Sequence, residues 1–116
     1  MTKAINSRQK GCRGEREWRD RIKANGFEAR RGQQFSGSPD SPDVISELPF
    51  HMEVKRVERL NIAEAMKQAE QDCGEMMPLV AHKKNNGPWL VTIPEWVFFK
   101  LITMQPIKAE NGKNDR

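Results

Sequence analysis

The feature that most constrains this chain is a pair of apolar runs that carry charged residues at fixed places. The first run, residues 41–45 (SPDVI), has Asp43 at its head, and the second, residues 50–55 (FHMEVK), carries Glu53 and Lys55. Side chains of a strand alternate between its two faces, so Glu53 and Lys55 point to the same face. We therefore expect two strands that bring an aspartate, a glutamate and a lysine to one edge of a sheet.

Two carboxylates and an ammonium group in one place suit metal-assisted hydrolysis of a phosphodiester. Carboxylate oxygens hold hard divalent cations, and Lys55 can orient or deprotonate a water molecule and balance phosphate charge. Each part has an ordinary alternative. Asp43 could be a turn residue, as could Asp40, which also follows a proline, and Glu53 with Lys55 could be an exposed pair on an edge strand. We prefer Asp43 to Asp40 because an apolar run follows Asp43 directly.

Composition is consistent with one basic domain. The chain has 116 residues, with 20 Lys and Arg against 16 Asp and Glu and a net charge of +4. This balance favours a polyanionic partner, although many small proteins are basic without one. The first third of the chain is especially rich in cationic residues: Arg8, Lys10, Arg13, Arg16, Arg19, Arg21, Lys23, Arg30 and Arg31. We predict a single domain over 1–116, with residues 1–9 and 105–116 flexible.

Cysteine and histidine usage argues against disulfide and zinc chemistry. The two cysteines, Cys12 and Cys73, have no Cys-x-x-Cys partner, and neither His51 nor His82 has companions at zinc spacing. We find no secretory leader and no apolar run of membrane-spanning length. These features predict a cytoplasmic protein with no membrane contact and with reduced thiols.

Periodicity and end signals predict the order helix, three strands, helix, two strands, helix. A helix between the third and fourth strands requires a parallel, right-handed crossover, so the sheet is expected to be mixed and the class α/β. Asn61 and Thr92 are the expected caps of the second and third helices, each with a glutamate three residues on. The expected ranges are helix 11–24; strands 27–31, 43–45 and 50–57; helix 61–74; strands 79–82 and 89–91; and helix 96–104.

Asp43 followed by Glu53 and Lys55 resembles the PD-(D/E)XK nuclease superfamily. Within it, four further segments are similar to archaeal Holliday junction resolvases and their phage-encoded relatives: residues 14–17 (GERE), 26–27 (GF), Arg31 and 78–83 (PLVAHK). The resemblance covers about residues 10–93. The segment between Arg31 and Asp43 is longer than expected for the family.

The resemblance implies a restriction-endonuclease-like fold, a mixed five-stranded sheet flanked by helices. It also implies a Mg²⁺ site, with Mn²⁺ as a substitute, formed by Asp43, Glu53 and the carbonyl of Val54. Glu15 would complete the acidic cluster, and Lys55 would be the catalytic lysine. Arg16, Arg31 and Lys83 would contact DNA phosphate, and charge adds Arg8, Lys10, Arg13 and Arg30. For Arg16 and Arg31, structural ion pairs are an equal alternative.

Two remaining features of the first helix concern glutamates. Glu15 shares a face with Trp18 and Ile22, so its carboxylate needs a partner, which a metal site would supply. Glu17, by contrast, is expected on a solvated face, paired with Arg21 four residues on.

The function that this resemblance implies is Mg²⁺-dependent cleavage of four-way DNA junctions. A nuclease of the same fold acting on flaps, single strands or duplex ends is the nearest alternative, and a non-catalytic DNA-binding module is another. Residues 96–102 are apolar nearly all round, which indicates packing on the sheet or a homodimer interface. A two-fold dimer would suit the two-fold symmetry of a four-way junction.

Overall fold

The computed structural model describes residues 3–32 and 42–104, with side chains from residue 12 onward. This part of the chain forms three helices and five strands. In chain order they are α1 (Lys3–Ala24), β1 (Ala29–Arg31), β2 (Val44–Ser46), β3 (Phe50–Arg56), α2 (Ile62–Asp72), β4 (Met77–Lys83), β5 (Leu90–Thr92) and α3 (Glu95–Met104).

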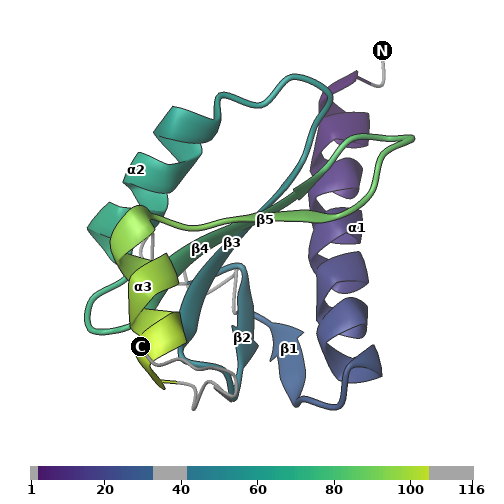
Figure 1. Cartoon of the computed structure of the whole chain (residues 1–116). Coiled ribbons are helices and arrows are strands. Elements are labelled where there is room, and N and C mark those ends of the chain that lie inside the picture. Colours follow the sequence, from purple (N-terminus) through teal and green to yellow (C-terminus); the bar gives the residue numbers. More distant parts are fainter. Residues whose placement is uncertain (1–2, 33–41, 105–116) are drawn as a thin grey trace.

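The five strands form one mixed sheet in the order β1-β2-β3-β4-β5 (Figure 1). All neighbours are antiparallel except β3 and β4, which are parallel and joined through α2. Parallel strands need a long crossover because the chain must return to the same end of the sheet. The predicted element order and mixed five-stranded sheet are therefore confirmed.

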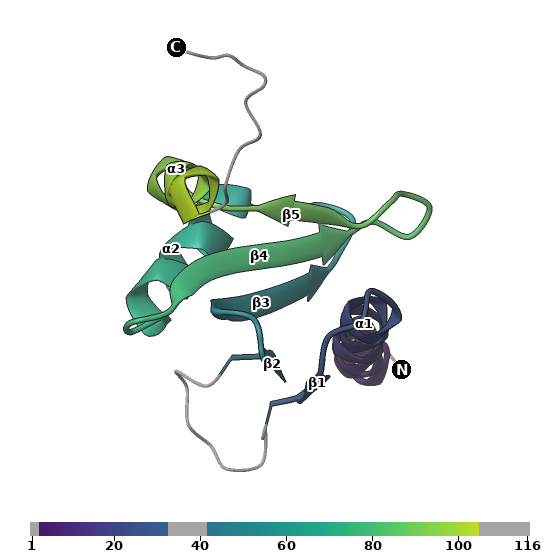
Figure 2. The same cartoon turned by 60° about the horizontal axis from the view of Figure 1, so that its bottom comes forward.

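The helices cover the two faces of the sheet, with α1 on one side and α2 and α3 on the other (Figure 2). Ile22 of α1 packs with Met52 and Val54 of β3 in the larger hydrophobic cluster. Ala65 and Ala69 of α2 pack on the opposite face in a smaller cluster. Because Met52 and Val54 face α1, the alternate residues of β3, Glu53 among them, face α2.

Close packing of α1 on β3 depends on Gly14. A Cβ atom placed on Gly14 would lie 2.9 Å from Cβ of Arg56, closer than two such atoms can approach. Any larger residue would push the helix away from the strand. Gly14, the first residue of the segment 14–17, thus sets how near α1 lies to the sheet.

Two predicted helix starts differ from the structure. The first helix begins at Lys3 rather than residue 11, because residues 3–10 contain no proline and Gly11 is tolerated inside the helix at a cost of about 1 kcal/mol. Thr92 does not cap α3. Its hydroxyl hydrogen-bonds Nε2 of His82 at 2.8 Å, and the helix starts after Pro94, whose carbonyl accepts from the N–H groups of Val97 and Phe98.

The predicted cap of α2 is confirmed: Oδ1 of Asn61 accepts a hydrogen bond from the N–H of Glu64 at 3.1 Å. None of the helices in the described residues is both long enough and apolar enough to cross a membrane.

Candidate active site

Asp43 is fixed by three hydrogen bonds at the start of β2. Its N–H donates to the carbonyl of Met52 at 2.9 Å, and its own carbonyl accepts from the N–H of Gly32 at the same distance. Its side-chain Oδ2 accepts from the N–H of Val54 at 2.8 Å. The carboxylate of Asp43 therefore accepts a backbone hydrogen bond of β3 that a neighbouring strand would otherwise accept. This bond holds the carboxylate against the middle of β3.

Gly32 makes this position of Asp43 possible. A Cβ atom on Gly32 would lie 2.1 Å from the carbonyl oxygen of Pro42, which is well inside contact distance. The obstruction is backbone, so no side-chain rotation could relieve it. The chain leaving β1 and the chain entering β2 can approach this closely only with a glycine at position 32.

The environment of Asp43 is strongly unfavourable for its negative charge. Burial, and then the charge of Glu53, raise the pKa of Asp43 to about 7, with a smaller contribution from Glu15. The hydrogen bond from Val54 and the charge of Lys55 act in the opposite direction but do not offset the rise. The site therefore holds more negative charge than its own cations balance, which favours binding of a cation.

Glu53 is almost completely buried on the α2 side of β3, with 3% of its surface exposed. Its Oε2 lies 2.9 Å from Nε2 of His51, two residues earlier on the same face. Asp72, at the end of α2, approaches the same pair. In the described part of the chain these three form one group of potential metal ligands whose atoms all lie within 4.8 Å of one another. Sequence spacing did not indicate this grouping.

Glu15 lies on α1 with its carboxylate 12% exposed, and its partner is Arg31 of β1. Arg31 donates from Nε and Nη2 to Oε1 of Glu15 at 3.1 and 2.9 Å, and this hydrogen bond raises the pKa of the guanidinium. The alternative left open for Arg31, a structural ion pair, is the arrangement found. Glu15 still lies near enough to Asp43 to raise its pKa.

Lys55 is half-buried on the α2 side of β3, opposite His82 of β4 in the parallel register. Its charge lowers the pKa of Asp43, so the ammonium group lies within electrostatic range of the acidic pair. The structure thus brings Asp43, Glu53, Glu15 and Lys55 to one region. It also gives Glu15 and Glu53 partners within the protein.

The predicted DNA-binding residues have different surroundings. Arg13, Arg16 and Arg30 are exposed. The ammonium group of Lys83 donates to the carbonyls of Lys84 and Asn85, at 3.1 and 3.3 Å, and so holds the turn after β4. The side chains of Arg8 and Lys10, and all of Asp40, lie outside the described residues.

Glu17 does not pair with Arg21 in the described structure, so that prediction was wrong. Its carboxylate accepts from Nε of Arg56 at 3.1 Å and from Nε of Arg13 at 3.4 Å. The cause is the close packing of α1 on β3, which brings Arg56 under the helix. Nη1 of Arg56 also donates to Oδ1 of Asn85 at 2.9 Å.

Sequence reasoning missed His51, Gly32 and Arg56 as parts of the site or its support. For His51 a signal was available, because it lies two residues before Glu53 and must share its face. Gly32 and Arg56 carried no comparable local signal, since their partners are 10 and more residues away along the chain.

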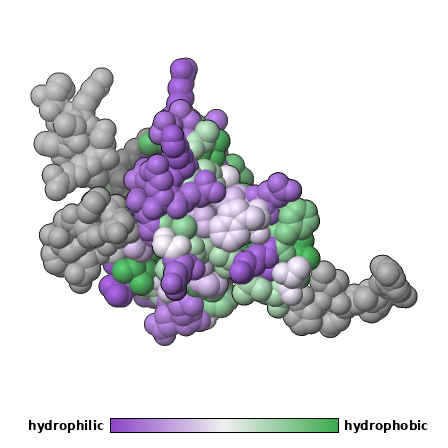
Figure 3. Space-filling view, turned by 90° about the vertical axis from the view of Figure 1, so that its left-hand side faces the viewer, coloured by the Kyte–Doolittle hydropathy of each residue, from purple (hydrophilic) through white to green (hydrophobic). Residues whose placement is uncertain are grey.

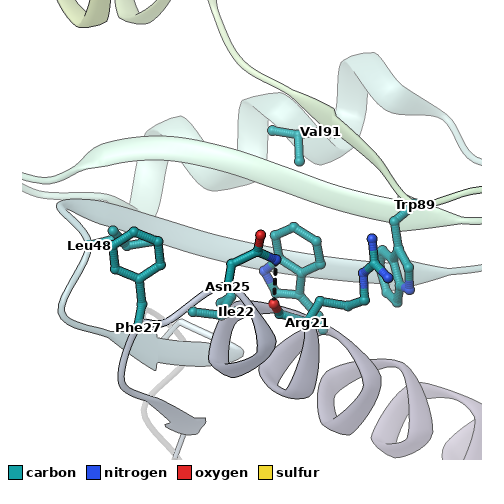
Figure 4. Close-up of a pocket in the computed structure, with 8 residues that line it drawn as sticks. Arg21, Ile22, Asn25, Phe27, Leu48, Trp89 and Val91 are labelled. Carbon is teal, nitrogen blue, oxygen red and sulfur yellow. Dashed lines mark hydrogen bonds between the residues drawn. The ribbon is translucent and has the colours of Figure 1, made fainter. Parts of the chain in front are cut away.

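Two pockets flank the sheet. A pocket of about 580 Å³ lies on the α2 side, where Arg59, Lys83 and Lys84 surround apolar Leu60 and Leu90. It includes His82, the residue of β4 that pairs with Lys55 in the sheet. A second pocket, of about 310 Å³, lies on the α1 side, with Trp89 at one end and Phe27 and Leu48 at the other (Figure 4).

Comparison with known proteins supports the fold. One solved structure, of Hjc, a Holliday junction resolvase from the archaeal hyperthermophile Archaeoglobus fulgidus, matches with a TM-score of 0.56 and 23% identity. The match covers 72% of each chain. The chain shares the fold of that structure, a mixed five-stranded sheet with helices on both faces. The predicted restriction-endonuclease-like class is therefore confirmed. No protein-family model matches the chain, and no curated protein matches it.

Proposed function

We propose that this protein is a Mg²⁺-dependent DNA endonuclease that resolves four-way junctions. The observation that carries the proposal is the pair of half-buried Asp43 and buried Glu53: burial, and then the charge of Glu53, raise the pKa of Asp43 to about 7, and Lys55 lies within electrostatic range. A protein keeps two carboxylates in such an unfavourable position mainly where a cation or a reaction needs them. The similarity to Hjc, described as a Holliday junction resolvase, supports junctions as the substrate.

The residues present fit a hard divalent cation. Asp43 and Glu53 offer carboxylate oxygens, and an excess of negative charge would be relieved by binding. The N–H of Val54 points at Asp43, and the carbonyl of the same strand residue faces the same side, so it can serve as a third ligand. Glu15 would lie next to these ligands. When bound, Mg²⁺, or Mn²⁺ in its place, would supply a nucleophilic water and neutralise charge on the phosphate.

The protein's own groups would do the remaining work. Lys55 would orient the attacking water, and its ammonium group would balance the charge that grows on the phosphate oxygens. The water oxygen bonds to phosphorus as the bond from phosphorus to the 3′ oxygen breaks. Arg31, held by Glu15, would keep that carboxylate aimed toward the acidic pair and would lie close to the incoming strand.

The exposed cations would bind the DNA backbone. Arg13, Arg16 and Arg30 are exposed on α1 and β1, Arg13 in a pair with Glu17, and we add Arg59 and Lys84 at the pocket that includes His82. Phosphate contacts position DNA without reading its bases, so selectivity would be for shape. Lys83 would act through the turn that it holds as well as through its charge.

We further propose that the protein works as a homodimer built around α3. Trp96, Phe98 and Phe99 are 49%, 49% and 53% exposed, although each is a large apolar residue. Figure 3 views the side where α2 and α3 lie, on which pale and green side chains are exposed beside a purple, hydrophilic region. A second copy is the favoured occupant because cutting a two-fold symmetric junction needs two active sites.

The deciding experiment is cleavage of an end-labelled four-way junction in Mg²⁺ with excess linear duplex as competitor. We expect paired nicks that persist with competitor, stop in EDTA, and stop in Asp43→Asn. Asp43→Asn should still bind the junction, since it retains an oxygen acceptor for the N–H of Val54.

Other outcomes would contradict parts of the proposal. Cutting that the duplex competitor suppresses would keep the active site and reject junctions as the substrate. Cutting that continues in Asp43→Asn would reject the site. Arg19→Ala serves as a matched control that removes one partly exposed charge, paired with Asp20, outside the site.

A further inference from the structure

We propose that His51 is a positioning residue for Glu53: it holds one carboxylate oxygen so that the other is presented to the metal. The inference rests on the proposed function and concerns a residue that lies outside the Asp, Glu and Lys set. It assigns to His51 no contact with DNA or with the metal.

The contact is short and local. Nε2 of His51 lies 2.9 Å from Oε2 of Glu53, within the range of a charge-assisted hydrogen bond. Both residues lie on β3, whose pairing with β4 fixes their backbones on consecutive positions of the same face. Because an ionised carboxylate only accepts, the tautomer that suits this contact carries its proton on Nε2, donates to Oε2 and leaves Oε1 without this donor.

Burial makes the contact necessary. The side chains of His51 and Glu53 are 3% and 4% exposed, so water has little access to replace the ring. A buried carboxylate without a donor is unstable and turns toward any other partner. With the ring in place, rotation of the carboxylate about its last bond is restricted, which is how groups behind a metal ligand raise the affinity of a metal site.

Asp43, like Glu53, has one carboxylate oxygen held by a hydrogen bond. Oδ2 of Asp43 is held by the N–H of Val54, so this ligand is also fixed by one oxygen. Glu53 and Asp43 are then two carboxylates, each anchored through one oxygen, with their charges close enough to raise the pKa of Asp43. The free oxygens of two anchored carboxylates form a site that needs little rearrangement to bind a cation.

A different reading of the same atoms is that a metal sits among His51, Glu53 and Asp72. The direct hydrogen bond between His51 and Glu53 argues against it, because an ion between the two would have to replace that bond. Asp72 therefore provides the discriminating variant: it belongs to the alternative and has no part in positioning.

The experiment measures Mn²⁺ binding to the metal-free, full-length protein by electron paramagnetic resonance, with His51→Leu, His51→Gln and Asp72→Asn. We expect His51→Leu to weaken Mn²⁺ binding about 10-fold, within the range seen when groups behind metal ligands are removed. His51→Gln, whose amide can donate from a similar position, should recover most of the affinity. Asp72→Asn should bind Mn²⁺ as the unaltered protein does.

Junction binding in EDTA separates positioning from damage to the fold, and it should be unchanged in His51→Leu. If His51→Leu does not fold, His51→Asn replaces it, since its shorter amide cannot reach Oε2. Unchanged Mn²⁺ affinity in His51→Leu, or in His51→Asn where it replaces that variant, would overturn the proposal. A loss of Mn²⁺ affinity in His51→Gln as large as in that variant would overturn it too. If Asp72→Asn lowers Mn²⁺ affinity as much as His51→Leu does, the ion binds among His51, Glu53 and Asp72 and the proposal is rejected.

The same data separate this inference from the proposed function. Junction cleavage by the unaltered protein, with normal Mn²⁺ affinity in His51→Leu, would reject the role of His51 alone. No Mn²⁺ binding and no cleavage by the unaltered protein would reject both.

Discussion

At the scale of single residues, the most informative group is the carboxyl of Asp43. It is fixed by backbone hydrogen bonds on both sides and lies among other acidic groups, of which Glu53 has the strongest effect on its pKa. Such a residue lowers the stability of the folded protein when it is charged. We therefore interpret it as a residue kept for binding and catalysis rather than for folding.

The raised pKa of Asp43 predicts how stability depends on pH without metal. Its pKa is about 7 in the folded protein against 3.8 as a reference, so between these values the folded state binds more protons than the unfolded state. The free energy of unfolding should then fall as pH rises from about 4 to about 7. Thermal midpoints in EDTA should show this fall, and Asp43→Asn should flatten it.

Addition of Mg²⁺ provides the control. If the cation binds the acidic pair, it should raise the thermal midpoint more at pH 7 than at pH 5, because the charged form of Asp43 binds it. An equal effect of Mg²⁺ on Asp43→Asn would contradict this assignment.

Arg56 is the residue whose role depends most on distant partners. It is 7% exposed and joins Glu17 of α1 to Asn85 of the turn after β4. Arg56→Leu should lower the free energy of unfolding by about 1–3 kcal/mol, measured with urea. Arg13→Leu is the matched control, since Arg13 pairs with the same Glu17 from an exposed position. It should change stability by less than about 0.5 kcal/mol.

At the scale of elements, the close approach of the end of β1 to the start of β2 determines where Asp43 lies. Gly32 and Pro42 bring the two backbones together, and Asp43 follows directly. The strand pair thus fixes the position of Asp43, one of the proposed metal ligands. The position of Asp43 depends on Gly32 because only a residue without a Cβ allows the two backbones to approach so closely. Gly32 does not adopt a backbone angle that other residues avoid.

Gly32→Ala should therefore disturb both stability and site. Overpacking of this kind costs roughly 1–3 kcal/mol, and the displaced β2 should also lower Mn²⁺ affinity. Gly87→Ala is the control, because a Cβ there would lie 3.7 Å from Lys84, an ordinary contact. Urea unfolding and Mn²⁺ titration of both variants test the prediction, and equal behaviour of the two would refute it.

At the scale of the whole molecule, α3 is the helix that leaves the most large apolar residues half exposed in the described chain. Of its residues only Val97 is buried within the described chain, while three large aromatic residues are about half exposed. A monomer rarely leaves such a cluster in water. Assembly of two copies would cover it and would set the distance between two active sites.

Phe98→Glu with Phe99→Glu should convert a dimer to a monomer, measured by analytical ultracentrifugation. The charged side chains should prevent association while cleavage in Mg²⁺ changes from paired to single nicks. Lys100→Glu, on the same helix and already exposed, is the matched control and should remain a dimer. A monomeric unaltered protein would reject this interface.

Three features could be predicted from the amino-acid sequence: the order of elements, the parallel crossover through α2, and the common face of Glu53 and Lys55. These follow from alternation, caps and connection lengths, which depend on residues close together in the chain. The predicted cap of α3 was wrong because the hydroxyl of Thr92 has another partner. It hydrogen-bonds His82 of the neighbouring strand β4 and does not cap α3.

The pairing of charged side chains, by contrast, follows from the packing of distant segments. Glu15 and Arg31 are 16 residues apart, and Glu17 and Arg56 are 39 apart, so no local pattern could pair them. The raised pKa of Asp43 likewise requires burial and a carboxylate from another strand. Electrostatic partners are set by distances in space, and those distances exist only after α1, β1 and β3 have packed together.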